Sequence, residues 1–216
     1  MKRLILGLGL FAVLIGTAAA ASVHEQGGDI FYVGDDGQSH QLTKSRNNGG
    51  AVLSPDGKKV AYLHIRPKVE RDHDLFRGNE IWLMDVTGKN AKRLLKTRIV
   101  DEDADDAAET KLGQFNSLAF AAAGGRLYFL SEAWMTSDAL HVIDLATGKQ
   151  KYIVDGNSIF VIPAGRYVGH LIVEQRHYLE EGGASNFYWL LTPAGKEVLM
   201  AGETWEQAMQ FVKREQ

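Results

Sequence analysis

The sequence predicts an all-β protein, a β-propeller-like array of about three and a half to four four-stranded blades with a short C-terminal α-helix. Two observations support this prediction. Short apolar runs alternate with turn residues about every 8–12 positions, a spacing typical of sandwiches, barrels and propellers. The runs form two alternating types of hairpin, and each pair of hairpins approaches the roughly 40–50 residues of a propeller blade. Three such pairs are present, at residues 50–95, 116–154 and 157–200.

The first residues of the chain have the pattern of a secretory signal peptide. A short basic segment precedes an apolar run over residues 4–15, and small residues follow. The run is shorter than the roughly 20 residues that a membrane-spanning helix needs. We therefore expect cleavage of residues 1–21 near Ala20 or Ala21, and a periplasmic or secreted protein with no membrane span after cleavage. An uncleaved N-terminal anchor is the alternative interpretation.

The composition of the chain argues against several classes of protein. The sequence contains no cysteine, so disulfides and cysteine nucleophiles play no part. Its formal net charge is −3, and it becomes −5 without Lys2 and Arg3. Because no basic cluster remains in the mature chain, we expect no binding to nucleic acid.

The first type of hairpin is clearest in "GGAVLSPDGKKVAYLHI", residues 49–65. Pro55 presets φ, the Asp56 side chain can bond to nearby backbone, and Gly57 tolerates a positive φ. The stretch therefore predicts a strand, a tight turn and a second strand that is apolar on both faces. The same hairpin recurs at residues 116–132 and, with a tight turn at Pro163-Ala164-Gly165, at residues 157–175.

The second type of hairpin is an apolar strand followed by an aspartate or threonine and a turn that contains Gly-Lys. It occurs as "NEIWLMDVTGKNAKRLL" at residues 79–95, and again at 138–154 and 185–200. An earlier copy at residues 28–43 turns at Asp36-Gly37 and has no partner hairpin before it. This copy predicts the two outer strands of an incomplete first blade.

These repeats resemble those of a known group of proteins. "LSPDGKKVAYL" followed by "IWLMDVTGKNAKRLL" is similar to the repeat of TolB-type periplasmic β-propellers and of the propeller domains of dipeptidyl peptidase relatives. The resemblance covers most of the mature chain and implies a propeller for residues 22–202. In the peptidase relatives, catalysis resides in a separate α/β-hydrolase domain with a G-x-S-x-G motif, which this sequence lacks.

The C-terminal residues 203–216 predict an amphipathic helix packed on the propeller-like domain. Thr204 is suited to be the N-cap, and Gln207 follows three residues later. Four apolar residues fall on one helical stripe that has to be buried: Trp205, Ala208, Met209 and Val212. We expect this helix to cover the open end of the array, or a homodimer to do so, because exposed strand edges invite pairing.

The long connections of the chain are predicted to share one face. In a propeller blade, the links between strands two and three and the links between blades lie on the face opposite the remaining turns. These links are residues 66–78, 96–114, 132–138 and 175–185. Since binding groups tend to sit on loops carried by a rigid scaffold, this long-loop face is the candidate site.

Polar, acidic and aromatic residues of these links are the candidate ligand- or partner-binding residues. Asp101–Asp106 resembles the start of a calcium loop, but Asp106 stands where glycine belongs and Leu112 where a bidentate glutamate belongs. A solvated acidic loop is therefore the favoured interpretation, and no metal site is predicted. The candidates are Arg71, His73, Asp74, Asp101, Asp103, Asp105, Trp134, His177 and Tyr178.

Together these observations predict an exported, non-catalytic binding or scaffold protein whose long-loop face binds a protein or a small ligand. We expect no catalytic residue and no cofactor. The expected partner is a protein of the cell envelope, or a second copy that pairs through open strand edges. The alternative is a small periplasmic enzyme or a metal-dependent binder that uses the acidic and histidine-bearing loops of the same face.

Overall fold

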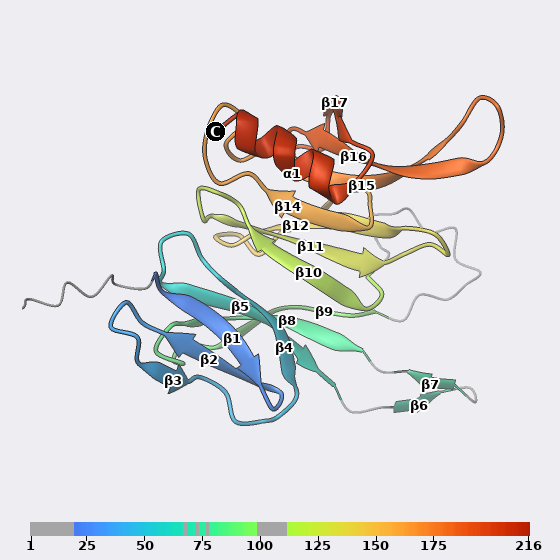
Figure 1. The fold of residues 1–216 in the computed structure, drawn as a ribbon. Helices are drawn as coiled ribbons and strands as arrows, with labels where there is room; N and C mark the ends of the chain where they lie inside the picture. The colour runs from blue at the N-terminus through green and yellow to red at the C-terminus, as the bar shows by residue number, and fades with distance from the viewer. Residues whose placement is uncertain (1–19, 67–68, 72–73, 77, 99–111) are drawn as a thin grey trace, which may run out of the picture.

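The computed structural model describes residues 20–216 apart from 67–68, 72–73, 77 and 99–111. Four antiparallel sheets are stacked one on the next in chain order, and one helix follows the last sheet (Figure 1). Within each sheet the strands lie side by side in the order of the sequence. This arrangement confirms the predicted all-β, propeller-like array with a C-terminal helix.

The first two sheets, blades 1 and 2, occupy the N-terminal half of the described chain. Blade 1 has three strands, β1 (Ser22–Gln26), β2 (Asp29–Val33) and β3 (Ser39–Gln41). Blade 2 has four strands, β4 (Asn48–Leu53), β5 (Lys59–Ile65), β8 (Asn79–Asp85) and β9 (Lys92–Lys96). Between β5 and β8 lies a separate hairpin of β6 (Val69–Arg71) and β7 (Asp74–Phe76).

Blades 3 and 4 are complete four-stranded sheets. Blade 3 consists of β10 (Phe115–Phe120), β11 (Arg126–Glu132), β12 (Asp138–Asp144) and β13 (Gln150–Asp155). Blade 4 consists of β14 (Ser158–Val161), β15 (Leu171–Tyr178), β16 (Ala184–Leu191) and β17 (Glu197–Gly202). The helix α1 (Trp205–Arg214) ends the chain.

The first blade differs from its prediction. Two strands were expected at residues 28–43, but a third strand, β1, pairs with β2 from Ser22 to Gln26. The pattern "SVHEQ" contains a single apolar residue, so it has no hydrophobic alternation by which a strand could be recognised. The β1–β2 link falls on the same side as the links between strands two and three of the other blades (Figure 1), so the described residues of blade 1 supply all of its strands except the innermost.

Two connections also differ from their predictions. The turn expected at Pro163-Ala164-Gly165 is instead a nine-residue segment, Ile162–His170, and β15 begins only at Leu171. The link at residues 66–78 carries the β6–β7 hairpin rather than irregular loop alone. Local turn residues do not reveal the enlarged turn, because it contacts the C-terminus, far away in sequence.

The core consists of three apolar layers between successive blades. In β5, Val60 and Tyr62 pack toward blade 1, whereas Ala61 packs toward blade 3. Between blades 3 and 4, Leu130 packs against Val173. Each central strand is therefore buried on both faces, which explains the continuous apolar runs of the sequence.

Helix α1 supplies a fourth apolar layer on the outer face of blade 4. Ala208 and Val212 are buried against Ile172 and Leu190 of the sheet. Thr204 is the N-cap, and its hydroxyl accepts a hydrogen bond from the Gln207 N–H at 3.3 Å. The predicted N-cap is present, whereas the predicted stripe is buried at Ala208 and Val212 but 40% exposed at Trp205. The helix covers the face against which a further blade would otherwise pack.

The C-terminal end of α1 rests on the enlarged turn of blade 4. The Arg166 N–H donates to the Glu215 carbonyl at 2.9 Å, and Tyr167 stacks on Phe211. Gly165 has φ +85°, and a Cβ there would collide with the backbone of Glu215. The glycine is therefore required by the close approach of two chain segments, which the repeat alone did not indicate.

A buried carboxylate joins blade 1 to blade 2. Asp29 is 5% exposed, and it accepts hydrogen bonds from the Arg46 N–H, the Thr43 hydroxyl and the Asn48 amide. The Arg46 N–H in particular lowers the pKa of Asp29 below its ordinary value. The hydrogen bonds therefore stabilise the folded chain more strongly when Asp29 is ionised than when it is protonated.

We expect Asp29→Asn to reduce the acid sensitivity of the protein. A folded-state pKa below the unfolded value contributes stability above the unfolded pKa, and this contribution is lost as the pH falls through the folded pKa. Urea unfolding at about pH 6 and about pH 3 should therefore show a smaller loss of stability in the variant than in the wild type. An equal loss in both proteins would contradict this role of Asp29.

Candidate functional site

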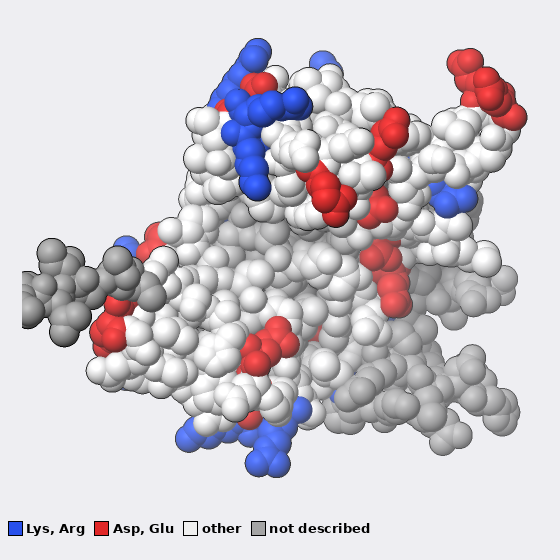
Figure 2. Space-filling view, in the orientation of Figure 1, with Lys and Arg blue, Asp and Glu red and all other residues white. Residues whose placement is uncertain are grey.

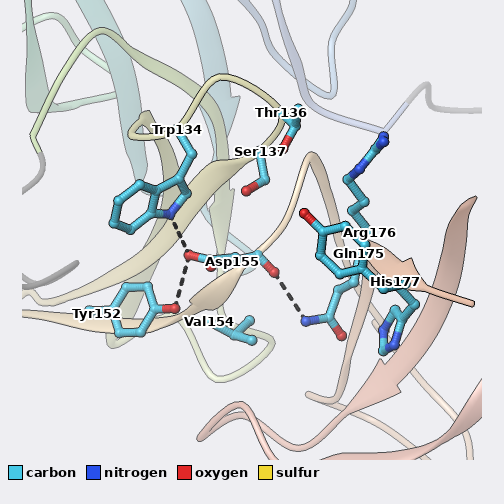
Figure 3. A pocket seen from close by; sticks show the side chains of 10 residues that line it. Trp134, Thr136, Ser137, Tyr152, Val154, Asp155, Gln175, Arg176 and His177 are labelled. Carbon is cyan, nitrogen blue, oxygen red and sulfur yellow. Dashed lines mark hydrogen bonds between the residues drawn. The ribbon is translucent and has the colours of Figure 1, made fainter. Parts of the chain in front are cut away.

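A pocket of about 430 Å³ lies between blades 3 and 4, at the end where the long connections emerge. The β12 side of it is formed by Trp134, Thr136 and Ser137 from the link between β11 and β12 (Figure 3). Tyr152 and Asp155 come from the end of β13, and Gln175 to Tyr178 from the end of β15. Strand ends and one short loop therefore build the site, and both blades contribute to it. Figure 1 shows that the β6–β7 and β15–β16 hairpins project from this same side.

The carboxylate of Asp155 fixes two aromatic side chains at the pocket. Its Oδ1 accepts a hydrogen bond from the Trp134 indole Nε1 at 2.9 Å and another from the Tyr152 hydroxyl at 3.0 Å (Figure 3). Burial, followed by the negative charge of Asp155, raises the pKa of Tyr152. The phenol therefore remains a protonated donor at neutral pH. This geometry holds both rings in place before any ligand arrives.

Gln175 connects the two blades beneath the pocket. Its Nε2 donates to the backbone carbonyl of Asp155 at 3.1 Å, and the side chain is only 7% exposed. Its Oε1 is buried and has no hydrogen-bond partner among the residues that the structure describes. A buried acceptor without a donor is costly, so this oxygen has unused capacity to accept a hydrogen bond.

The β15 side of the pocket combines one packed ring with one exposed ring. His177 stacks on Trp189 with ring centroids 4.9 Å apart, which orients the imidazole along the sheet. Tyr178 is 83% exposed, an unusual condition for an aromatic side chain beside a pocket. Trp134 on the opposite blade is also substantially exposed, at 43%. Two exposed rings thus flank one polar cavity.

Comparison with solved structures places the fold among propeller proteins. Dipeptidyl peptidase 4 from Porphyromonas gingivalis matches with a TM-score of 0.52 and 13% identity over 84% of this chain. An oligogalacturonate lyase in complex with manganese matches with a TM-score of 0.50 and 15% identity over 79%. The fold is that of a β-propeller array. A putative TolB from Agrobacterium tumefaciens also matches, at a TM-score of 0.48 and 17% identity over 80% of this chain.

These matches concern the propeller fold alone. The chain spans 31% of the peptidase, 41% of the lyase and 55% of the putative TolB. No protein-family model matches the sequence, and no curated protein matches it. Two of the three propellers are named as enzymes, so the fold does not assign an activity, and the local chemistry of the pocket has to support the function.

Three of the nine predicted site residues meet at this pocket. Trp134, His177 and Tyr178 line it, although they lie on different blades and more than forty positions separate Trp134 from the other two. Arg71 and Asp74 are backbone partners in the register of the β6–β7 pair. The other predicted residues, His73, Asp101, Asp103 and Asp105, lie outside the described residues.

Sequence reasoning overlooked Tyr152, Asp155 and Gln175 at the pocket. Tyr152 and Asp155 lie within β13, outside the predicted links, and Gln175 begins the predicted link 175–185 but was not among the candidate residues. The pattern "YIVD" at the end of β13 carried a usable signal, because an acidic residue closes an apolar strand just before a blade link. The pairing of Asp155 with Trp134 is not local in sequence, because it joins the β11–β12 link to the end of β13 within blade 3.

The described residues set two further bounds on the site. No group of three or more His, Asp or Glu side chains there is arranged to hold a metal ion. No helix in the described part of the chain has the length and apolar character needed to cross a membrane.

Proposed function

We propose that the protein is an exported binding protein whose long-loop face holds a ligand without changing it chemically, and that the pocket between blades 3 and 4 is the binding site. The observation that carries the proposal is the pair of exposed rings beside a preorganised carboxylate. Of these two rings, Trp134 is already held by its hydrogen bond to Asp155, so it loses little conformational freedom when it contacts a ligand, which suits binding.

The polar groups of the pocket support binding more than catalysis. The Asp155 Oδ1 already carries two hydrogen bonds, and the raised pKa of Tyr152 argues against the phenol as a base. His177 stacks on Trp189 along the sheet. The hydrogen bonds and ring stacking of these side chains fix the shape of the pocket, which is the arrangement expected of a recognition site.

Thermal unfolding in the presence of an envelope extract tests this proposal. The extract should raise the Tm of the wild-type mature chain, because a ligand that binds only the folded state stabilises it. Trp134→Ala should abolish the shift. Met135→Ala is the matched control, since Met135 follows Trp134 in the same loop, is fully exposed and does not line the pocket.

Two results would contradict this function. One is an extract that leaves the Tm of the wild type unchanged, or shifts Trp134→Ala by the same amount. The other is turnover of an extract component that is lost in His73→Ala or on addition of a chelator. Such turnover would favour the enzyme or metal-dependent binder that the acidic and histidine-bearing loops also suggest.

A further inference from the structure

We infer that the ligand of this pocket is an uncharged saccharide bound with a sugar ring against Trp134 or Tyr178. This inference rests on the proposed function, and it adds the chemical class of the ligand. Three independent features of the pocket carry it: its charge, its unused hydrogen-bond acceptors and its exposed aromatic surface.

The charge of the pocket favours a neutral ligand. Asp155 contributes one negative charge and Arg176 one positive charge, and the remaining lining residues are formally uncharged. Figure 3 shows these two side chains on opposite blades, each emerging from the end of its strand. A strongly anionic or cationic ligand would meet one favourable and one unfavourable partner, so charge gives it no clear advantage. On the face shown in Figure 2, acidic and basic side chains likewise form separate small groups rather than one large patch of a single charge.

The polar atoms of the pocket require a ligand that donates hydrogen bonds. The Gln175 Oε1 is a buried acceptor without a partner among the described residues, and the Trp134 and Tyr152 hydrogen bonds to the Asp155 carboxylate both end on its Oδ1. Thr136 and Ser137 add hydroxyl groups at the rim (Figure 3). A saccharide presents many hydroxyl donors on a compact ring, whereas an extended peptide brings a backbone carbonyl for every backbone N–H.

The exposed rings supply the apolar part of the recognition. A sugar ring has faces of C–H groups, and these can pack on a flat aromatic side chain while the hydroxyls at its edge remain free for hydrogen bonds. Tyr178 and Trp134 offer such surfaces at 83% and 43% exposure. The hydrogen bond from the Trp134 Nε1 to Asp155 places an aromatic face and an acceptor next to each other.

A glycan array and calorimetry test the inference. The full mature chain is applied to immobilised neutral and acidic glycans and to a matched array of unmodified peptides, and any glycan that is retained is then titrated in solution. We expect retention of neutral glycans. Tyr178→Ala should weaken binding about tenfold or more, whereas its neighbour Leu179→Ala, which does not line the pocket, should leave binding unchanged.

A second variant probes the acceptors. Asp155→Asn keeps one carbonyl oxygen for the Trp134 and Tyr152 donors and turns the other oxygen into an amide donor. Binding of a hydroxyl donor should therefore fall about tenfold while the fold is retained, as circular dichroism would verify.

The outcomes separate this inference from the proposed function. Retention of peptides or of acidic glycans only, with loss in Tyr178→Ala, would overturn the neutral saccharide and leave a binding pocket. Retention of neutral glycans that is insensitive to both Tyr178→Ala and Asp155→Asn would overturn the site. Retention of nothing on either array would overturn the saccharide, and the extract experiment would then decide whether the pocket binds at all.

Discussion

Ala208→Asp is expected to destabilise the protein by at least about 3 kcal/mol, because it places a carboxylate in an apolar layer without a partner. Ala208 is 0% exposed and packs with Ile172 and Leu190 against the outer face of blade 4. A domain of this size is stable by only about 5–15 kcal/mol, so the change removes a large part of its stability. The midpoint of urea unfolding, followed by circular dichroism, measures the effect.

Gln210→Asp is the matched control for this experiment. Gln210 lies on the exposed side of the same helix, so the same new charge there should cost less than about 1 kcal/mol. Deletion of residues 203–216 should reproduce the large effect, since it exposes the whole outer face of blade 4. A truncated chain that remains a monomer and keeps its unfolding midpoint would contradict the capping role of α1.

Asn79→Ala is expected to cost about 3 kcal/mol, because it leaves two buried backbone groups without partners. The Asn79 Nδ2 donates to the Phe115 carbonyl at 2.8 Å, and the Phe115 N–H donates to the Asn79 Oδ1 at 2.9 Å. Asn79 begins β8 of blade 2, and Phe115 begins β10 of blade 3. One side chain therefore completes the hydrogen bonding where one blade passes to the next.

Asn116→Ala provides the comparison for the loss of the two hydrogen bonds between Asn79 and the Phe115 backbone. Asn116 is half-buried and its amide makes one hydrogen bond to the Asp138 carboxylate, at 3.0 Å, so its loss should cost about 1 kcal/mol. Hydrogen exchange adds a local measurement, since the Phe115 amide should lose its protection in Asn79→Ala and keep it in Asn116→Ala. Equal destabilisation by the two variants would contradict a special role for Asn79.

The fold could be predicted from the sequence because each blade is a local unit. The turn at Pro55-Asp56-Gly57 and the strands around it lie within about fifteen residues, and the same pattern recurs along the chain. The helix could also be predicted from the sequence, since Thr204 and the apolar stripe are a few residues apart. The enlarged turn Ile162–His170 was missed because its partner is the distant C-terminus.

The candidate site was only partly predictable. Trp134, His177 and Tyr178 could be singled out as unusual residues of long connections, and the structure brings all three to one pocket. The carboxylate that organises the pocket, Asp155, closes the apolar strand β13, but this local pattern does not show that Trp134 binds to it. Its hydrogen bond from Tyr152 joins residues three positions apart in β13, whereas the one from Trp134 forms only when the β11–β12 link folds over the end of β13.

The sequence by itself determined the blade repeat, the phase of its strands and therefore the end of the molecule that carries the long links. These features depend on turns and alternation within a few residues, which local physical chemistry specifies. Only the tertiary structure decided which side chains meet. The pocket joins residues of two blades, and stacking of β-sheets depends on apolar burial summed over many strands, so no local pattern could place Tyr178 opposite Trp134.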